Sequence, residues 1–367
     1  MSPKYTPLVD ALPSSVPFIG PETQERKRGA PFDARLGANE NGFGPSPRAI
    51  AAMAEAAAGS WMYGDPENFD LKAALAAHHN IAPENIVVGE GIDGLLGYLA
   101  RMMIAPGDRV VTSAGAYPTF NFHVNGFGGV IHSVPYSADH EDPNALIAKA
   151  QEVDPKLIYI ANPDNPMGSH HPQETMAKMI AAVPEGSLLI LDEAYLELAP
   201  ADIAPPINVT DQRVIRMRTF SKGYAMAGAR VGYAIAHADL IRSFDKIRNH
   251  FGMGRMAQAG ALAALRDPAW LAHIQAQVAR ARDEISKIAR MNGLVPLPSA
   301  TNFVTIDCGA DGAFAKRVLT ELSARGIFIR MPFVAPQDRC IRVSCGPEAE
   351  VAAFKRALPL ALLAARG

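Results

Sequence analysis

Residues 218–230 read Arg-Thr-Phe-Ser-Lys-Gly-Tyr-Ala-Met-Ala-Gly-Ala-Arg, the most informative stretch of this 367-residue chain. A lysine, Lys222, follows Thr219 and Ser221, and Arg230 comes eight residues later. The amine can form an imine with an aldehyde, while the hydroxyls and the guanidinium can hold a phosphate. A solvated surface lysine explains Lys222 equally well when it is taken alone, so other parts of the chain must fit around the same ligand.

Working outward from this stretch, short apolar and β-branched runs alternate with helical segments. We expect strands at 86–88, 109–112, 129–131, 157–160, 188–191, 214–217 and 231–235. Helical patterns such as 93–103 and 172–182 lie between most of them. Unbroken apolar strands separated by helices are typical of a mostly parallel sheet covered on both faces. The fold class is therefore predicted to be α/β.

The pattern changes after a helix-rich segment at 239–290. Three further strands are expected at 302–306, 327–330 and 340–344, with helices at 312–325 and 347–365, which indicates a small α+β unit. The first 35 residues, rich in proline and polar residues, are expected to be an arm lying on the body. We predict an N-terminal arm (1–40) joining the small domain, a large domain (41–265) and a small C-terminal domain (266–367).

Composition excludes several classes of function. The formal net charge is −2, which provides no electrostatic attraction to nucleic acid or to an anionic membrane. No apolar run approaches the roughly 18 residues that span a bilayer, and the N-terminus lacks the pattern of a secretory signal. Only Cys308, Cys340 and Cys345 occur, an odd and sparse set that favours reduced thiols and a cytoplasmic protein.

The run Gly89-Glu90-Gly91-Ile92-Asp93-Gly94 follows a strand and opens a helix, as G-x-G-x-x-G requires. A dinucleotide site also needs an acidic residue at the end of the next strand, but that strand ends Val-Val-Thr-Ser-Ala at 110–114. A glycine-rich turn at a helix N-terminus still presents free N–H groups to a single phosphate. A single-phosphate site is favoured, with a purely structural tight turn as the alternative.

Two further motifs follow apolar strands. Asp192 begins Asp-Glu-Ala-Tyr after the run 188–191, and no Gly-Lys-Ser or Gly-Lys-Thr exists to support a nucleotide triphosphatase. A buried carboxylate needs a partner, which a protonated pyridine nitrogen would supply; capping of the following turn is the alternative. Asn165, within Asn-Pro-Asp-Asn-Pro-Met-Gly at 162–168, could donate its amide to a ring oxygen, although turn chemistry alone explains the segment.

The remaining candidates are weaker. Phe120, in Tyr-Pro-Thr-Phe at 117–120, could stack on a planar cofactor or belong to the core. The histidine pairs at 78–79 and 170–171 are adjacent residues whose side chains point apart, and the cysteines lack zinc spacing. We expect no bound metal.

Taken in order, these motifs resemble those of fold-type I, pyridoxal-phosphate-dependent aminotransferases of class I/II, nearest to the histidinol-phosphate aminotransferase branch. The resemblance runs from about residue 38 to residue 346. Each motif is weak alone, but the ordered set is specific. It comprises residues 39–47, 63–66, 89–94, 118–120, 162–168, 192–195, 219–222 with Arg230, and 342–344.

The resemblance implies pyridoxal 5'-phosphate as the cofactor. Lys222 would bind it covalently and carry a proton between substrate and cofactor, and Asp192 would pair with the ring nitrogen. Asn165 and Tyr195 would contact the ring oxygen, and Phe120 would stack on the ring. The phosphate would be held by residues of two motifs, namely Gly91, Ile92, Thr219, Ser221 and Arg230.

The resemblance also implies a homodimer, in which Tyr63 reaches the phosphate of the partner's cofactor. Arg342 would clamp the substrate carboxylate with a bidentate fork, and Asn41 would contribute to substrate binding. The reaction would be a ping-pong exchange of an amino group between an amino donor and a 2-oxo acid.

One departure from the branch affects the substrate. A tyrosine of a Pro-Tyr pair near the N-terminus helps to bind substrate phosphate in that branch, whereas Phe18 stands here. Arg330 still matches the branch's phosphate-contacting arginine, and Arg255 stands where relatives carry small or polar residues. The hypothesis is therefore an amino acid that is aromatic or has a distal anionic group, held by Arg342 with Arg330 or Arg255, in place of histidinol phosphate.

Two rival functions share this scaffold. A decarboxylase of the threonine-phosphate type would use the same cofactor-binding residues and differ only in its product. A catalytically silent binding protein is the other rival, but the intact set of Lys222, Asp192, Asn165 and Arg230 argues against it.

Overall fold

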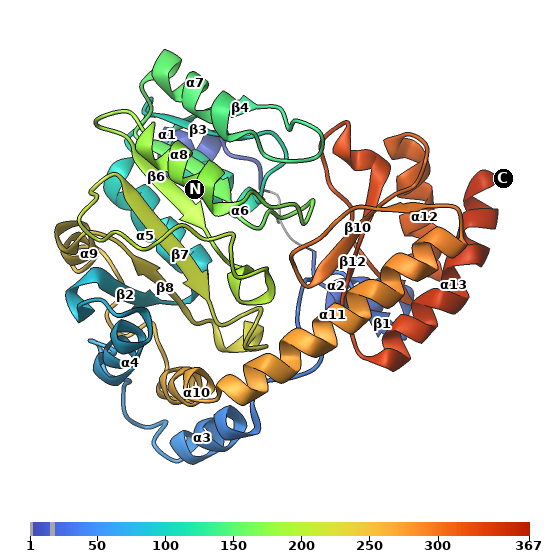
Figure 1. Cartoon of the computed structure of the whole chain (residues 1–367), viewed down its shortest axis with the longest axis horizontal. Helices are drawn as coiled ribbons and strands as arrows, with labels where there is room; N and C mark the ends of the chain where they lie inside the picture. Colours follow the sequence, from blue (N-terminus) through green and yellow to red (C-terminus); the bar gives the residue numbers. More distant parts are fainter. Residues whose placement is uncertain (1–2, 15–18) are drawn as a thin grey trace.

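The computed structural model describes residues 3–14 and 19–367, which form a large unit and a small unit (Figure 1). The large unit is built on a seven-stranded sheet in the order β2-β8-β7-β6-β5-β3-β4. Only β8 runs antiparallel to its neighbours, so the predicted mostly parallel sheet is confirmed. Its strands are β2 (Ile86–Gly89), β3 (Arg109–Ser113), β4 (Val130–Val134), β5 (Leu157–Ala161), β6 (Leu188–Asp192), β7 (Val214–Thr219) and β8 (Gly232–Ile235).

Helices cover both faces of this sheet, because its central strands are apolar on both sides. In β5, Leu157 and Tyr159 belong to the core on one face, and Ile158 and Ile160 belong to the core on the other. Such alternation within an unbroken apolar run requires a helical layer on each side. The helices of the large unit are α3 (Pro47–Ala57), which packs on α10, and α4 (Phe69–His79), α5 (Gly91–Met103), α6 (Pro118–Gly126), α7 (Pro143–Val153), α8 (Gln173–Ala181), α9 (Ala238–Phe244) and α10 (Arg255–Leu265).

The small unit is the predicted α+β element. Its antiparallel sheet has the order β12-β10-β9, and three helices pack around the core that it shares with them. The long helix α11 runs from the large unit to the small one (Figure 1). The elements are α11 (Pro268–Met291), β9 (Val295–Pro296), β10 (Phe303–Asp307), α12 (Gly312–Ala324), β11 (Ile327–Phe328), β12 (Cys340–Ser344) and α13 (Glu348–Arg366).

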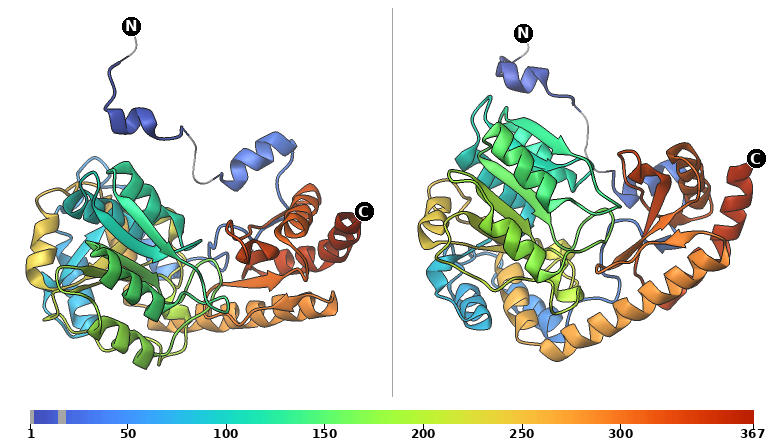
Figure 2. Two further views of the ribbon diagram at one scale, coloured as in Figure 1. Left: turned by 90° about the horizontal axis from the view of Figure 1, so that it is seen from above. Right: turned by 45° about the horizontal axis from the view of Figure 1, so that its top comes forward.

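Part of the N-terminal arm joins the small unit. Strand β1 (Ala34–Arg35) pairs in parallel with β11, and the Arg35 guanidinium binds the carboxylates of Glu22 and Glu25 in α2 (Pro21–Arg28). Helix α1 (Pro7–Ala11) differs from the expectation of an arm lying on the body. It has no buried residue and lies apart from both units (Figure 2). The domain boundaries at 40 and 265 remain predictions.

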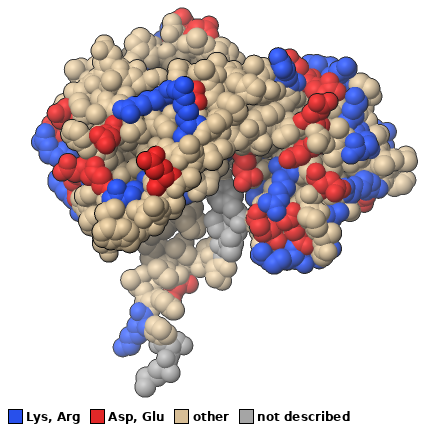
Figure 3. Space-filling model, turned by 90° about the horizontal axis from the view of Figure 1, so that it is seen from below, with Lys and Arg blue, Asp and Glu red and all other residues tan. Residues whose placement is uncertain are grey.

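Two observations concern the prediction that neither nucleic acid nor a membrane is a partner: the distribution of surface charge and the character of the helices. On the face shown in Figure 3, acidic and basic side chains are intermingled over the small unit, without a large area of one sign. Within residues 3–14 and 19–367, no helix combines the length and the apolar character needed to cross a membrane.

Candidate active site

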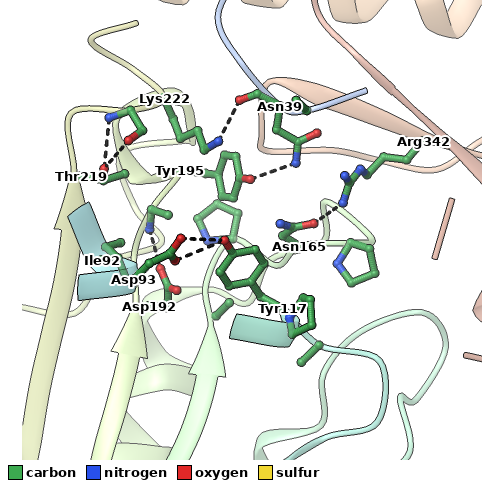
Figure 4. A pocket seen from close by; sticks show the side chains of 18 of the residues that line it. Asn39, Ile92, Asp93, Tyr117, Asn165, Asp192, Tyr195, Thr219, Lys222 and Arg342 are labelled. Atoms are coloured by element: carbon green, nitrogen blue, oxygen red, sulfur yellow. Dashed lines mark hydrogen bonds between the residues drawn. The ribbon is translucent and has the colours of Figure 1, made fainter. Parts of the chain in front are cut away.

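A cavity of about 350 Å³ lies between the two units, at the carboxyl ends of β5, β6 and β7. Parallel strands bring their carboxyl ends to one edge of the sheet, so side chains far apart in sequence meet there. Figure 4 shows these side chains converging on the cavity. Of the residues predicted from the sequence, the following line it: Ile92, Asn165, Asp192, Tyr195, Thr219, Ser221, Lys222, Arg230, Arg330 and Arg342.

Lys222 projects into this cavity from the loop that follows β7. Its Nζ donates a hydrogen bond to the backbone carbonyl of Asn39 over 2.9 Å. Burial, together with the nearby Arg342 guanidinium, lowers the pKa of Lys222 to about 8. A much larger fraction of this amine than of an ordinary lysine is therefore neutral near physiological pH, and a nucleophilic or proton-carrying lysine acts in that form.

Asp192 ends β6 and is 4% exposed. Its Oδ2 accepts a hydrogen bond from the Tyr159 hydroxyl at 2.7 Å, and its Oδ1 accepts one from the Ala194 N–H at 3.0 Å. Burial raises the pKa of Asp192 to about 6, and these two hydrogen bonds oppose that rise. Such a carboxylate, without a basic partner among the salt bridges of the described residues, would be stabilised by a cation placed in the cavity.

A phosphate-sized cradle lies at the N-terminus of α5. Gly91 has a φ of +78°, and a Cβ there would come within 2.4 Å of the Arg230 guanidinium. The Ser221 hydroxyl accepts from Arg230 at 3.5 Å and from the Thr219 hydroxyl at 2.9 Å. Free N–H groups of a helix N-terminus, two hydroxyls and a guanidinium together form a favourable site for a phosphate.

Arg342 comes from β12 in the small unit and faces Asn165 of the large unit. One Nη of Arg342 donates to the Oδ1 of Asn165, and its guanidinium carbon lies 5.2 Å from the centre of the Phe303 ring. The Nε atom is buried and has no hydrogen-bond partner among the residues that the structure describes. Burial lowers the pKa of Arg342 to about 10. A desolvated guanidinium with an unused donor is suited to bind a carboxylate or a phosphate.

Arg330 lies directly beside Arg342. The two residues form an antiparallel bridge, with Arg342 N–H donating to the Arg330 carbonyl at 2.7 Å and Arg330 N–H donating to the Arg342 carbonyl at 3.2 Å. Opposed residues of an antiparallel pair project to the same side. Both side chains therefore line the cavity, and Arg330 also donates to the Ile19 carbonyl of the N-terminal arm at 2.8 Å.

A buried ion network holds the ends of β6 and β7 together beneath these groups. Glu193, 1% exposed, accepts hydrogen bonds from Arg216 and from Arg218, the latter at 2.9 Å. Asp192 precedes Glu193, and Arg218 is in the strand that leads to Lys222. This network fixes the spacing of the two strand ends, which the sequence analysis did not foresee.

Tyr117 is one of several aromatic residues at the cavity, whereas Phe120, predicted to stack on the cofactor ring, does not line it. Phe120 is 1% exposed and its ring stacks on Tyr159 at 4.9 Å in the core of the large unit. Tyr117 lines the cavity, and its hydroxyl donates to Asp93 at 3.2 Å. Helix α6 begins at Pro118, so Tyr117 precedes the helix while Phe120 falls on its buried side.

Besides Phe120 and Gly91, three predicted site residues lie outside this cavity. Asn41 donates its amide to the backbone carbonyl of Lys222 at 2.9 Å and so holds the lysine's backbone. Tyr63 is 77% exposed, and Arg255 donates to its carbonyl at 2.9 Å. Neither Tyr63 nor Arg255 lines the cavity of its own chain. Phe18 lies outside the described residues.

These residues fit pyridoxal 5'-phosphate. The glycine-containing cradle suits its phosphate, the buried Asp192 carboxylate suits a protonated ring nitrogen, and the Lys222 amine suits its aldehyde. Within the described ranges, no group of three or more His, Cys, Asp or Glu residues is placed to hold a metal ion.

Comparison with known proteins agrees with this geometry. Residues 34–358 match the family described as aminotransferase class I and II. The histidinol-phosphate aminotransferase of Moorella thermoacetica is 32% identical, covering 97% of this chain and 92% of that protein. The relative of the same name from an Anaeromyxobacter species is 34% identical, covering 89% of this chain and 90% of its own.

Solved structures extend the match. A crystal structure of the histidinol-phosphate aminotransferase from Sinorhizobium meliloti, in complex with pyridoxal-5'-phosphate, has a TM-score of 0.97 and 50% identity. It covers 99% of this chain and 98% of that chain. The decarboxylase alternative is not favoured by these relatives. The chain is a pyridoxal-phosphate-dependent transaminase and belongs to the class I and II aminotransferases, in the histidinol-phosphate aminotransferase-like branch.

Proposed function

We propose that the amino donor of this transaminase carries an anionic group bound jointly by Arg342 and Arg330. The observation that carries this proposal is the backbone bridge that sets the two arginines side by side at one end of the cavity. Two adjacent guanidiniums repel each other unless an anion lies between them. A phosphate ester such as histidinol phosphate, which relatives are named for, satisfies this demand, and so does an amino acid with a second, distal anion.

We further propose the following division of work among the residues around the cofactor. Bound pyridoxal phosphate supplies an electrophilic carbonyl and an electron-accepting ring. The Lys222 amine binds it and carries a proton to and from the substrate carbon. Asp192 keeps the ring nitrogen charged, and Asn165 and Tyr195 hold the ring oxygen.

The phosphate of the cofactor would be held by two segments that meet at the cradle. Gly91 and Ile92 would offer backbone N–H groups. Thr219, Ser221 and Arg230 would offer hydroxyls and a guanidinium. In the cradle, Gly91 is tight against Arg230, and Arg230 reaches Ser221, which supports this assignment.

A donor screen tests the proposed substrate class. We expect histidinol phosphate to be turned over with a far higher kcat/KM than histidinol, which lacks the phosphate, and glutamate with a far higher kcat/KM than phenylalanine, which lacks the distal carboxylate. Arg330→Gln should lower kcat/KM for the preferred donor by roughly ten- to a hundredfold, the cost of one charged hydrogen bond. It should change little the turnover of the analogue that lacks the phosphate or the distal carboxylate. Equal turnover of histidinol phosphate and histidinol would contradict the proposal.

A homodimer is the proposed assembly, with Tyr63 of one chain reaching the cofactor phosphate in its partner. Tyr63 and Trp61 are 77% and 82% exposed, and Tyr63 packs on Phe251 at 4.7 Å between ring centres. Large aromatic side chains exposed together are typical of interfaces. Arg255 holds the Tyr63 backbone and would accompany it into the partner's cavity.

Subunit mixing tests this assembly. Lys222→Ala and Tyr63→Ala chains should each have little activity alone. A mixed dimer contains one intact site, made of Lys222 from one chain and Tyr63 from the other. Refolding the two variants together should therefore restore activity. With random pairing, half of the dimers are mixed and each mixed dimer has one working site out of two, so the activity should reach up to about a quarter of the wild-type value. Unchanged low activity in the mixture, with mixed dimers demonstrated by native mass spectrometry, would exclude a shared site.

We propose that the protein works in the cytoplasm. Cys308, Cys340 and Cys345 are free and buried, which supports a reducing compartment. Fractionation of the native host with detection of the protein tests this location.

A further inference from the structure

Asn39 connects the two units at the cavity, although the sequence analysis did not single it out as a site residue. It is 2% exposed, and its φ of +54° is in the left-handed region that asparagine tolerates better than most residues. Its Nδ2 donates to the Tyr195 hydroxyl at 3.0 Å, and its carbonyl accepts from Lys222 Nζ at 2.9 Å. Figure 4 shows both contacts.

Ser344 of β12 fixes the orientation of the Asn39 amide. Its hydroxyl oxygen accepts from the Asn39 backbone N–H at 3.0 Å, and the same hydroxyl donates to Asn39 Oδ1 at 3.1 Å. Because Oδ1 is occupied by this donor, Nδ2 is left to face Tyr195. The arrangement has a defined direction: serine donates to asparagine, and asparagine donates to tyrosine.

This direction determines where the Tyr195 hydrogen points. A hydroxyl has one hydrogen, and the Tyr195 oxygen already accepts from Asn39. The phenolic hydrogen is therefore left to be donated elsewhere, and Tyr195 lines the cavity. An acceptor at position 39 would instead attract that hydrogen away from the cavity.

We propose that Asn39 is a positioning residue that directs the Tyr195 hydrogen bond toward the ring oxygen of the cofactor. The proposal rests on the role of Tyr195 given under the proposed function. Under this proposal the small unit also helps to orient Tyr195, because Ser344, which binds the Asn39 amide, lies on the same strand as Arg342. Substrate binding at Arg342 and orientation of Tyr195 would then be linked through one strand.

Asn39→Asp tests the direction of the hydrogen bond without changing the size of the side chain. Aspartate accepts from both Ser344 and Tyr195, so the phenol should turn away from the cofactor. Loss of a donor to the ring oxygen disfavours its ionised form, so the pH midpoint of the visible absorption band of the bound cofactor should rise by roughly one unit. Tyr195→Phe should raise it to a similar extent.

A double-mutant cycle separates this effect from the added charge. If Asn39 acts through Tyr195, the Asn39→Asp/Tyr195→Phe double variant should have the same midpoint as Tyr195→Phe alone. Additive shifts would mean that the new charge acts directly, and they would overturn the proposal. Asn39→Gly keeps the left-handed backbone, carries no charge, and should give a smaller rise in the same direction.

The matched control is Asn80→Asp, at an exposed asparagine with a φ of +52° at the end of α4. It should leave the midpoint unchanged. A shift in Tyr195→Phe with none in Asn39→Asp would overturn the role of Asn39 and leave the proposed function intact. No shift in Tyr195→Phe would overturn both roles. Cofactor that stays covalently attached in Lys222→Ala, detected by mass spectrometry after borohydride reduction, would contradict the proposed function separately.

Discussion

The Tyr159 hydroxyl donates to Oδ2 of Asp192 over 2.7 Å, and both side chains are buried at the base of the cavity. A tyrosine in the middle of an apolar strand is expected to be a core residue, and the ring of Tyr159 does stack on Phe120. Its hydroxyl, however, fixes the carboxylate that we propose pairs with the cofactor ring nitrogen. The buried carboxylate is therefore oriented by neutral donors and still has room to be stabilised by a cation.

Asp192→Asn should stabilise the cofactor-free protein at neutral pH. The folded-state pKa of Asp192 is raised by burial to about 6 from its ordinary 3.8, so its ionised form opposes folding. At pH 7 the effect is up to about 3 kcal/mol, from 1.36 kcal/mol per pKa unit. The difference should shrink as the pH falls through 6 and vanish below about 4, where the group is protonated in both states.

Urea unfolding of both cofactor-free proteins at pH 7 and pH 4 measures this difference. With cofactor bound the order should reverse, because the variant cannot pair with the ring cation. A variant that is less stable than wild type at pH 7 without cofactor would contradict the burial argument.

The capture of pyridoxal phosphate by the cofactor-free protein should accelerate as the pH rises through about 8. Burial and Arg342 lower the pKa of Lys222 to that value, and only the neutral amine attacks an aldehyde. Arg342→Gln removes a repelling cation, so the midpoint of the rate profile should move upward by roughly half a unit to one unit. Stopped-flow absorbance measures the rate. Arg339→Gln, outside the cavity, is the control, and an equal shift there would point to a nonspecific charge effect.

Gly91→Ala should weaken cofactor binding at the phosphate cradle. The new Cβ would lie 2.4 Å from Arg230 Nη2, so the guanidinium must leave the cradle. Loss of one charged hydrogen bond predicts a dissociation constant roughly ten- to a hundredfold higher. Gly107→Ala is the matched control, because its φ is +89° and nothing lies within 4 Å of the added Cβ. Both variants should lose about 1–2 kcal/mol of stability, but only Gly91→Ala should lose cofactor. Equilibrium dialysis and urea unfolding separate the two effects.

Alanine variants of Tyr117 and Phe120 should have opposite phenotypes. Phe120→Ala leaves a cavity in the core and should lower the free energy of unfolding by about 3–5 kcal/mol. Tyr117→Ala should cost little stability but raise the cofactor dissociation constant roughly five- to tenfold, the value of one aromatic stacking contact. Tyr117→Phe keeps the ring and should bind nearly normally. Weak cofactor binding by a Phe120→Ala protein that is still folded would restore the original assignment.

Much of the large unit could be predicted from local patterns. The seven expected strands all exist, because a strand buried on both faces is apolar at nearly every position, and the largest error at an end is in the edge strand β4, which ends at Val134 and was expected to end at 131. The short strands β1 and β9, two residues each, have no such signal and were not predicted. Strand β1 pairs with β11, which is distant in sequence, whereas β9 pairs with β10, the next strand along the chain.

Part of the candidate site could likewise be predicted from local sequence patterns, and part could not. Asp192, Asn165 and Lys222 follow strands directly, so a parallel sheet gathers them without further information. Phe120 was misplaced because one turn of helix decides whether an aromatic residue faces the cavity or the core. Arg255 does not line the cavity of its own chain, and its predicted contact with a substrate stays a prediction.

By itself, the sequence determined which reactive and ligand-binding side chains are available and the order of the helices and strands. Both follow from apolar periodicity and motif spacing, which are local properties of the chain. Only the tertiary structure decided which donors and acceptors meet: Tyr159 with Asp192, Asn39 with Tyr195, and Arg330 with Arg342. The physical reason is that a hydrogen bond acts over about 3 Å and depends on direction. Such contacts join residues that are 33 positions apart in the first pair and 156 in the second, so they exist only after the chain has folded.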